Sequence, residues 1–184
     1  MTTTEFIKTY SQAIIDACKG TTLFPSVKMA QAALETGWGA KVMGEAHNMF
    51  GIKAAGPHSP YWKGDFVTSN TTEYENGAYV PHQLKFRKYA SLADSIRDHT
   101  YFLQQNHIYD AVFLAKTPID QAKALLAAGY ATDYLYANKL ITIINTNNLN
   151  KLDKKTKSMK NFDYLIWGLL LLVAVAGLYK AYKS

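Results

Sequence analysis

The stretch Ala30–Ala54, AQAALETGWGAKVMGEAHNMFGIKA, begins as an apolar helix and then presents a carboxylate followed by a glycine-rich turn. Pro25 suits the first helical position, and apolar residues then recur at the helical period, so we predict a helix with one face against a core. Glu35 closes this helix just before the Gly-Trp-Gly turn at 37–39. An acidic side chain among alanine and leucine requires either solvent or a chemical role.

The composition is that of a globular protein. The chain has 184 residues, of which 48% are hydrophobic and 13% aromatic, enough for one domain with a substantial core. Its net charge is +6, but residues 151–184 hold seven of the 20 basic side chains and only two of the 14 acidic ones. Residues 1–150 are therefore nearly neutral, and we predict no nucleic-acid partner.

Cysteine and histidine usage excludes several kinds of site. Cys18 is the single cysteine, so no intrachain disulfide can form. It lies in an apolar helical pattern, which favours a buried free thiol over a nucleophile. The five histidines lack the spacing of metal ligands, and we predict neither a metal site nor a cofactor.

Helical periodicity prevails in the first 146 residues, and a glycine- and proline-rich segment at 36–66 is predicted as loop. Asn76-Gly77 is a strong turn dipeptide between two candidate strands, which predicts one β-hairpin. The fold class is therefore α+β and mainly helical. The predicted helices cover residues 5–20, 25–35, 91–106 and 117–128, with a last one beginning at Thr132 and Asp133.

A charge-free run of sixteen residues, Tyr164–Tyr179, lies near the C-terminus. As a helix it spans roughly 24 Å, slightly less than the ~30 Å hydrocarbon core, and flanking lysines can snorkel to extend it. We predict a transmembrane helix over 163–180, in preference to a buried core helix. The predicted domain is then 1–146, followed by a lysine-rich linker at 147–162, the transmembrane helix and a short tail at 181–184.

Two glutamates are candidates for acid–base chemistry: Glu35 and Glu73, the latter in TTEYENG within the predicted hairpin. A carboxylic acid against apolar walls keeps its proton, because desolvation penalises the charged form. Such an acid can protonate a departing sugar oxygen, while a second, wetter carboxylate directs water or stabilises an oxocarbenium ion. Alternation along a strand places Glu75 on the same face as Glu73, so spacing alone does not separate them.

Seven short motifs occur in one order: QAALETGWG, NMFGIKA, WKG, TTEYENG, KFRKY, GYATD and YANKL. Together they resemble the FlgJ-like glucosaminidase family of peptidoglycan hydrolases over roughly residues 5–146. The resemblance implies a mainly helical, lysozyme-like α+β domain with a small β-hairpin. It also implies an endo-β-N-acetylglucosaminidase, which hydrolyses the β-1,4 bond after N-acetylglucosamine in peptidoglycan. Tyr134 departs from the proline that the family often has after YATD.

The resemblance implies that Glu35 is the general acid and that Glu73, on a mobile hairpin, is the second carboxylate; the motif position favours Glu73 over Glu75. It also implies that Tyr130 of GYATD is a further active-site residue. For Trp38, packing behind the acid is favoured over stacking on a sugar. The residues expected to form the substrate-binding cleft are Trp38, Asn48, Phe50, Gly51, Trp62, Tyr74 and Glu75.

Other functions stay open at this point. A lytic transglycosylase or a muramidase on the same fold would use the same kind of catalytic glutamate, but the TTEYENG segment favours hydrolysis. A non-catalytic, membrane-tethered wall-binding protein belongs to a different class. The presence of Glu35, Glu73 and Tyr130 argues against it.

Location is predicted from charge. The first ten residues lack the basic and apolar regions of a secretory signal, and the positive-inside bias of the lysines around 163–180 would leave the domain in the cytoplasm. We therefore expect either a phage lysin or virion-associated wall-opening enzyme, or a bacterial envelope enzyme with its domain outside. The expected partners are peptidoglycan glycan strands and a lipid bilayer; the sequence leaves the oligomeric state open.

Overall fold

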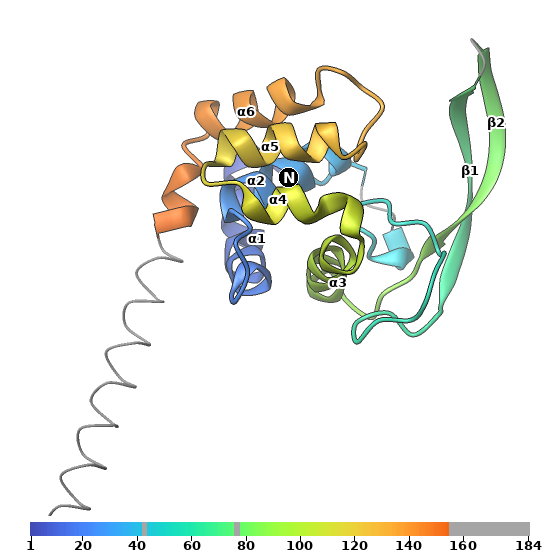
Figure 1. The fold of residues 1–184 in the computed structure, drawn as a ribbon. Helices are drawn as coiled ribbons and strands as arrows, with labels where there is room; N and C mark the ends of the chain where they lie inside the picture. Colours follow the sequence, from blue (N-terminus) through green and yellow to red (C-terminus); the bar gives the residue numbers. More distant parts are fainter. Residues whose placement is uncertain (42–43, 76–77, 155–184) are drawn as a thin grey trace, which may run out of the picture.

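The computed structural model describes residues 1–41, 44–75 and 78–154, with the backbone alone for 71–75 and 78–79. Figure 1 shows a helical body with one long β-hairpin standing beside it. The predicted mainly helical α+β class is confirmed. The elements are α1 (Thr3–Cys18), α2 (Pro25–Thr36), η1 (Gly44–Ala46), β1 (Phe66–Glu75), β2 (Ala78–Arg87), α3 (Leu92–Gln105), η2 (His107–Tyr109), α4 (Asp110–Leu114), α5 (Pro118–Ala127) and α6 (Tyr136–Thr146).

Side-chain caps set the starts of three helices. The hydroxyl of Thr2 accepts from the backbone N–H of Glu5 at 3.2 Å, and the Glu5 carboxylate accepts from the Thr2 N–H at 2.7 Å, a capping box that begins α1. Ser91 caps α3 and Thr117 caps α5, each by accepting from the N–H three residues later. The two latter helices begin where the sequence predicts.

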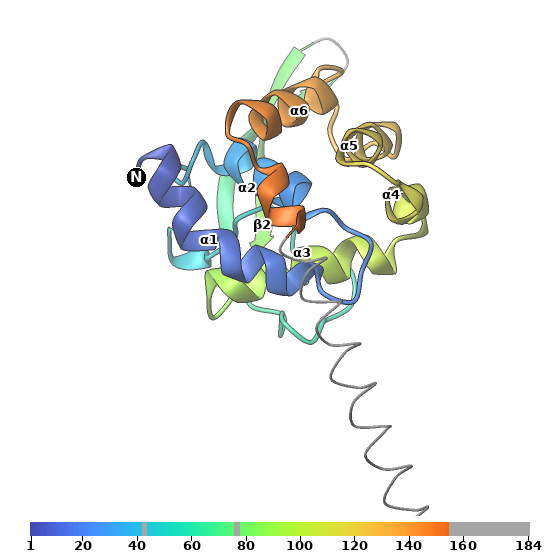
Figure 2. The same cartoon turned by 90° about the vertical axis from the view of Figure 1, so that its left-hand side faces the viewer.

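Helix α2 is the central helix of the body and packs against α1, α5 and α6 (Figure 2). Its small side chains at Ala30, Ala32 and Ala33 are fully buried, which lets the neighbouring helices approach closely. Cys18, at the end of α1, is also fully buried, as predicted for a free thiol. Most of α2 is buried, including Thr36 at its end, whereas the side chain of Glu35 in the last turn is exposed.

The turn after Glu35 is left-handed throughout: φ is 55° at Gly37, 60° at Trp38 and 86° at Gly39. A bulky residue disfavours this region, so Trp38 must be held there by its surroundings. Its N–H donates to the Ala33 carbonyl at 2.9 Å, and its ring packs edge-to-face on Phe6 at 5.6 Å. These contacts agree with the packing interpretation of Trp38.

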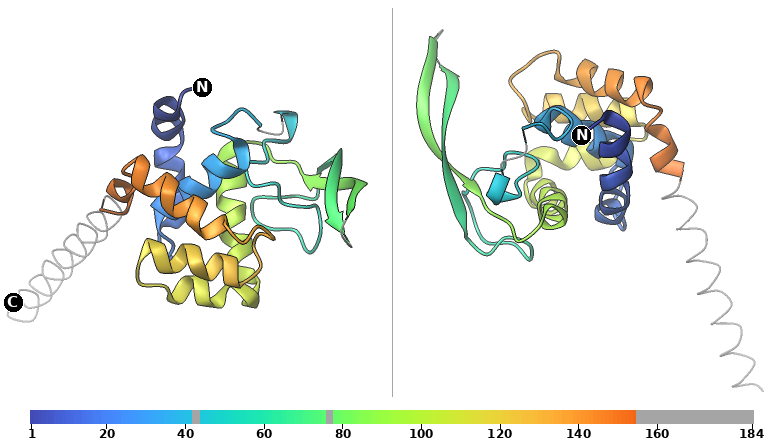
Figure 3. Two further views of the ribbon diagram at one scale, coloured as in Figure 1. Left: turned by 90° about the horizontal axis from the view of Figure 1, so that it is seen from above. Right: turned by 180° about the vertical axis from the view of Figure 1, so that it is seen from behind.

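Strands β1 and β2 form a two-stranded antiparallel sheet, in register from Phe66 opposite Arg87 to Glu75 opposite Ala78. The predicted Asn76-Gly77 turn lies outside the described residues. At its base the hairpin is joined to the NMFGIK loop, because the Arg87 N–H donates to the Ile52 carbonyl at 2.9 Å. The hairpin and the C-terminal segment at 147–154 lie on opposite sides of the helical body (Figure 3).

Asp98 of α3 anchors the base of the hairpin through an ion pair with Arg87, the last residue of β2. Its fully buried carboxylate accepts from Arg87 Nη1 at 2.8 Å, from the Tyr89 hydroxyl at 2.7 Å and from the Ser59 hydroxyl. Arg87 Nη2 also donates to the Ala55 carbonyl at 2.9 Å. The end of β2, the loop before β1 and α3 are thus tied to one buried ion pair.

The folded body extends past the predicted boundary at residue 146. Leu149 and Leu152 are buried in the core, and residues 150–154 are helical. The Asp153 carboxylate accepts from the N–H and the hydroxyl of Ser26, both at 2.8 Å, at the start of α2. The first part of the predicted linker is therefore part of the domain.

The last helix begins later than predicted. Asp133 does not start α6; its carboxylate accepts from the Leu135 N–H at 2.9 Å, and its carbonyl accepts from the Tyr136 N–H at 2.9 Å. This turn leaves residues 130–135 as a loop. None of the helices in the described ranges is long and apolar enough to cross a membrane, and the predicted transmembrane helix at 163–180 falls outside those ranges.

Candidate active site

A cavity of about 500 Å³ lies beside the C-terminal end of α2. Its walls come from the last turn of α2, the loop that follows η1, the C-terminal part of α3 with η2, and the loop before α6. The lining residues are Glu35, Phe50, Gly51, Ile52, Lys53, Ala55, Phe102, Tyr109, Tyr130, Ala131, Thr132 and Asp133. The cavity therefore combines one glutamate from the helix end with a wall of aromatic rings, an arrangement suited to a polar ligand with apolar faces.

Glu35 is held by a hydrogen-bonded series that starts one helical turn earlier. Gln31 Nε2 donates to the Tyr136 hydroxyl oxygen at 3.1 Å, and that hydroxyl donates to Glu35 Oε1 at 3.4 Å. Gln31 and Glu35 are four residues apart and share one face of α2, so both reach the same tyrosine. Tyr136 is buried and thus limits where the Glu35 carboxylate can lie.

The pKa of Glu35 is raised above its ordinary value, because surrounding protein atoms desolvate the charged carboxylate; the hydrogen bond from Tyr136 opposes this shift. Glu35 nevertheless remains open to solvent through the cavity. A carboxyl group whose pKa is raised and that a ligand can reach is a candidate general acid.

Tyr130 faces the same cavity from the loop before α6. Its hydroxyl lies 2.8 Å from His99 Nε2, and its ring stacks on that of Tyr136 with centroids 5.6 Å apart. Burial raises the pKa of Tyr130 well above its ordinary value, and the nearby Tyr136 and Glu35 raise it further. The Tyr130 hydroxyl is therefore neutral and remains available as a hydrogen-bond donor.

The structure brings four of the predicted site residues to this cavity: Glu35, Phe50, Gly51 and Tyr130. Phe50 is buried, lines the cavity and stacks on the ring of His99 with centroids 4.0 Å apart. Gly51 adopts φ of 61°, a conformation that L side chains rarely adopt, so glycine lets the loop turn at the cavity wall.

Three predicted binding residues do not line the cavity: Trp38, Asn48 and Trp62. Asn48 is buried, and its amide bonds to the backbone of Ile52 and Arg87 at 3.0 to 3.1 Å, so it fixes the loop from inside. Trp62 is also buried, with the Arg87 guanidinium 4.2 Å from its ring centroid. Asn48 thus holds the loop that carries the lining residue Ile52, whereas Trp62 Nε1 donates to the Asp65 carbonyl away from the cavity.

The hairpin candidates lie at the far end of β1. Glu73 pairs with Val80, and Glu75 pairs with Ala78, but the side chains of Glu73, Tyr74 and Glu75 are outside the description. At about 3.3 Å per residue, Glu73 lies roughly 23 Å along the strand from Phe66 at the base. Its relation to Glu35 remains a prediction.

The fold brings several further side chains to the Glu35 cavity that the sequence did not indicate as site residues. The motifs and helical periodicity assign no role at the site to Tyr136, Tyr109 or Phe102. A signal existed for Tyr136, which begins the YANKL motif, and for Lys53 and Asp133, which belong to NMFGIKA and GYATD. Tyr109 lies in no motif, and only its packing beside Tyr130, with centroids 6.1 Å apart, identifies it.

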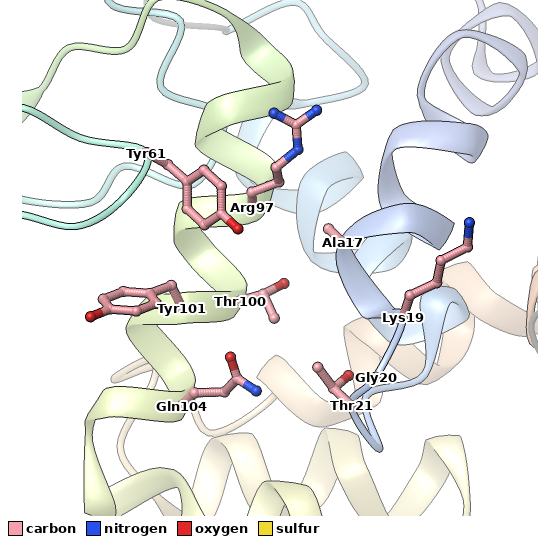
Figure 4. Close-up of a pocket in the computed structure, with 9 residues that line it drawn as sticks. All are labelled: Ala17, Lys19, Gly20, Thr21, Tyr61, Arg97, Thr100, Tyr101 and Gln104. Atoms are coloured by element: carbon pink, nitrogen blue, oxygen red, sulfur yellow. The ribbon is translucent and has the colours of Figure 1, made fainter.

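A second, smaller cavity of about 170 Å³ lies between the end of α1 and α3 (Figure 4). Lys19 and Arg97 flank it, but each already pairs with an aspartate on its own helix or beside it, Asp16 at 2.8 Å and Asp94 at 3.0 Å. None of its lining residues is shared with the Glu35 cavity, and none is a carboxylate or a histidine. It offers no acid–base pair.

Comparison with known proteins identifies the domain. The glucosaminidase family, described as mannosyl-glycoprotein endo-beta-N-acetylglucosaminidase, matches residues 11–149. The chain is 42% identical over 143 residues to the peptidoglycan hydrolase FlgJ of Escherichia coli K12, covering 74% of this chain and 44% of FlgJ. It is 34% identical over 147 residues to the exo-glucosaminidase LytG of Bacillus subtilis, covering 77% of this chain and 50% of LytG.

The chain thus spans about half the length of these curated relatives. Among solved structures, the catalytic domain of the autolysin Auto from Listeria monocytogenes superposes with a TM-score of 0.72 at 34% identity, covering 82% of this chain and 87% of that domain. The fold is therefore lysozyme-like, and the chain belongs to the glucosaminidase family.

Proposed function

We propose that this protein hydrolyses the β-1,4 glycosidic bond after N-acetylglucosamine in peptidoglycan glycan strands. The observation that carries the proposal is Glu35, a carboxyl with a raised pKa at the wall of an aromatic-lined cavity of about 500 Å³. Membership of the glucosaminidase family supports the reaction class. The names of the relatives, a peptidoglycan hydrolase and an exo-glucosaminidase, support the substrate.

Glu35 acts as the general acid in this proposal. Its proton passes to the glycosidic oxygen as the bond from that oxygen to the anomeric carbon breaks, which leaves an oxocarbenium-like centre. Water adds its hydroxyl to this centre, and its remaining proton returns to Glu35, either directly or from the second carboxylate by exchange with solvent. Each cycle consumes one water and restores the acid.

Glu73 is the proposed second carboxylate, with Glu75 as the alternative. Motif position supports Glu73, which lies on β1 of the hairpin beside the helical body. An ionised carboxylate at this step stabilises the cationic centre or directs the water. Tyr130 contributes a neutral hydroxyl to the same cavity and is proposed as a donor to the substrate.

Digestion of purified peptidoglycan tests the reaction. The full-length chain is compared with Glu35→Gln, and the products are identified by mass spectrometry. We expect reducing N-acetylglucosamine ends from the wild type and a loss of about 10²- to 10⁴-fold in rate for Glu35→Gln, the usual contribution of general acid catalysis. The matched control is Glu45→Gln, an exposed glutamate of η1 outside the Glu35 cavity, which should keep the wild-type rate.

The products also separate the alternatives. Anhydro-muramyl ends would identify a lytic transglycosylase, and reducing N-acetylmuramic acid ends would identify a muramidase. Binding to peptidoglycan without any product, from the wild type and Glu35→Gln alike, would identify a wall-binding protein on the same fold.

We also propose that residues 163–180 anchor the protein in a bilayer, so that the lipid membrane is a second partner. The charge-free run between Asp163 and Lys180 supports this. The proposed location is a bacterial envelope or a phage virion membrane. Flotation with lipid vesicles tests the anchor: the full chain should float and a chain ending at Lys154 should not. Detection in purified virions or in uninfected envelopes decides the location.

A further inference from the structure

Two buried ionisable side chains that the proposed reaction does not use lie directly behind Tyr130. Lys28 of α2 is 2% exposed, and His99 of α3 is fully buried. Lys28 Nζ lies 2.6 Å from His99 Nδ1, and His99 Nε2 lies 2.8 Å from the Tyr130 hydroxyl. The three side chains form a hydrogen-bonded series that ends at the cavity wall, where Tyr130 lies with Glu35.

The chemistry of the groups sets the direction of each hydrogen bond. An ammonium group has three donors and no acceptor, so Lys28 donates to His99 Nδ1, which must be unprotonated. A neutral imidazole then carries its hydrogen on Nε2 and donates it to the Tyr130 oxygen. Because that oxygen accepts from His99, the hydrogen of Tyr130 itself is directed elsewhere.

The electrostatics agree with this assignment. Burial holds the pKa of His99 well below its usual value, and the positive charge of Lys28 lowers it further, so the ring is neutral. Burial also lowers the pKa of Lys28 to about 8, which leaves it mainly charged at neutral pH. An imidazolium at His99 would have to face an ammonium across 2.6 Å.

Packing fixes the plane of the imidazole. The ring of Phe50 stacks on His99 with centroids 4.0 Å apart and an interplanar angle of 6°, and Lys28 Nζ lies 5.1 Å from the Phe50 ring centroid. Phe50 therefore contacts both members of the pair. This stacking fixes the ring so that Nε2 of His99 is directed at the Tyr130 hydroxyl.

We propose that Lys28 and His99 are positioning residues that select one tautomer of His99 and thereby hold the Tyr130 hydroxyl as a hydrogen-bond donor directed into the cavity. This inference rests on the proposed function, in which Tyr130 faces the substrate. It also accounts for a lysine buried in the central helix. A lysine is costly to bury without a partner, whereas an apolar side chain at position 28 would pack without that cost.

The experiment uses the full-length chain in detergent, as wild type, Lys28→Met, Tyr130→Phe and the double variant. Methionine keeps the length of the side chain and removes the donor. Long-range ¹H–¹⁵N NMR of the histidine rings reports the tautomer, with the His99 signals identified by their loss in His99→Gln. Peptidoglycan digestion gives kcat and KM separately.

We expect a single Nε2–H tautomer of His99 in the wild type and a mixture in Lys28→Met. We expect kcat of Lys28→Met to fall roughly ten- to a hundredfold, by analogy with the hydrogen-bond partners that orient metal-bound histidines, with little change in KM. Lys28→Met should cause no further loss in the Tyr130→Phe background, because both changes remove the same directed hydroxyl.

Gln121→Met is the control for lost stability. Gln121 is buried, and its amide bonds to the backbone of Thr22, Phe24 and Val112, away from the cavity. Gln121→Met should lower the melting temperature and keep kcat.

The rescue test is at His99. A glutamine at this position can accept from Lys28 and donate to Tyr130, so His99→Gln should retain more activity than His99→Phe.

Three results would overturn the inference: an Nδ1–H tautomer in the wild type, an unchanged kcat in Lys28→Met, or additive losses in the double variant. Failure of the proposed function is distinct from these. If Glu35→Gln remains active, the proposed function fails. The NMR measurement of the His99 tautomer still tests the Lys28–His99–Tyr130 hydrogen bonds, because it does not depend on activity. If Glu35→Gln is inactive and Tyr130→Phe keeps the wild-type kcat, the proposed reaction through Glu35 stands, whereas the donor role of Tyr130 and the positioning role of Lys28 and His99 are overturned.

Discussion

The hydroxyl of Tyr136 donates to Oε1 of Glu35 across 3.4 Å, although the two residues are 101 positions apart and belong to different helices. Tyr136 is the first residue of α6, and Glu35 lies in the last turn of α2. The packing of α6 on α2 therefore contributes to the pKa of the proposed acid, whose larger determinant is desolvation. This relationship leads to the first prediction.

Tyr136→Phe should move the alkaline limb of the pH–rate profile to higher pH. The Tyr136 hydrogen bond lowers the pKa of Glu35, against the larger effect of desolvation, so its removal raises that pKa further. A general acid must be protonated, and kcat/KM falls as pH rises through its pKa, so a higher pKa extends activity upward. The measurement is kcat/KM against pH.

Tyr136→Phe should also lose stability. In Tyr136→Phe, Gln31 loses the acceptor of its 3.1 Å hydrogen bond. The free energy of unfolding measured with urea should therefore fall by about 1 to 3 kcal/mol. Tyr134→Phe, at a tyrosine that is 81% exposed, serves as the matched control and should alter neither quantity. A limb displaced to lower pH in Tyr136→Phe would contradict the assigned direction of the bond.

Asp98→Asn should destabilise the protein strongly. The carboxylate is fully buried and forms an ion pair with Arg87 at 2.8 Å, so its neutralisation leaves a buried cation without its counter-charge. Breaking one partner of a buried pair costs about 3 to 5 kcal/mol. Urea denaturation measures this loss, and Asp16→Asn, which breaks an exposed pair with Lys19, should cost about 1 kcal/mol or less.

A chain ending at Thr146, the predicted domain boundary, should be less stable than one ending at Lys154. Leu149 and Leu152 are buried, and each apolar side chain of this size contributes about 1.5 to 3 kcal/mol when buried. The shorter chain also loses the bonds between Asp153 and Ser26 at the start of α2. Thermal unfolding of the two chains compares them directly; equal melting temperatures would show that residues 147–154 contribute nothing to stability.

Gly39→Ala should destabilise the turn that follows Glu35. Gly39 has φ of 86°, and a Cβ there would lie 3.3 Å from the ring of Phe6. The left-handed conformation alone costs an L-residue about 1 to 2 kcal/mol. Gly44→Ala is the matched control, because a Cβ at Gly44 would meet nothing within 4 Å. Differential scanning calorimetry should show a lower melting temperature for Gly39→Ala alone.

The prediction from sequence was accurate where the signals are local. Caps at Ser91 and Thr117, proline at the start of α2 and apolar periodicity each act within one or two helical turns, and the corresponding helices begin as predicted. It was less accurate at Asp133, where a capping-type residue instead closes a turn before α6. A single polar residue before a helix is compatible with both conformations, and the tertiary packing of the loop decides between them.

The sequence by itself determined the mainly helical α+β class, the hairpin, the buried thiol and, through its motifs, the family and the choice of Glu35. Only the tertiary structure decided which side chains surround that acid. The link from Lys28 to His99 joins residues 71 positions apart, and the link from Ser26 to Asp153 joins residues 127 apart. Such contacts depend on how whole helices pack, and no pattern confined to neighbouring residues specifies that packing.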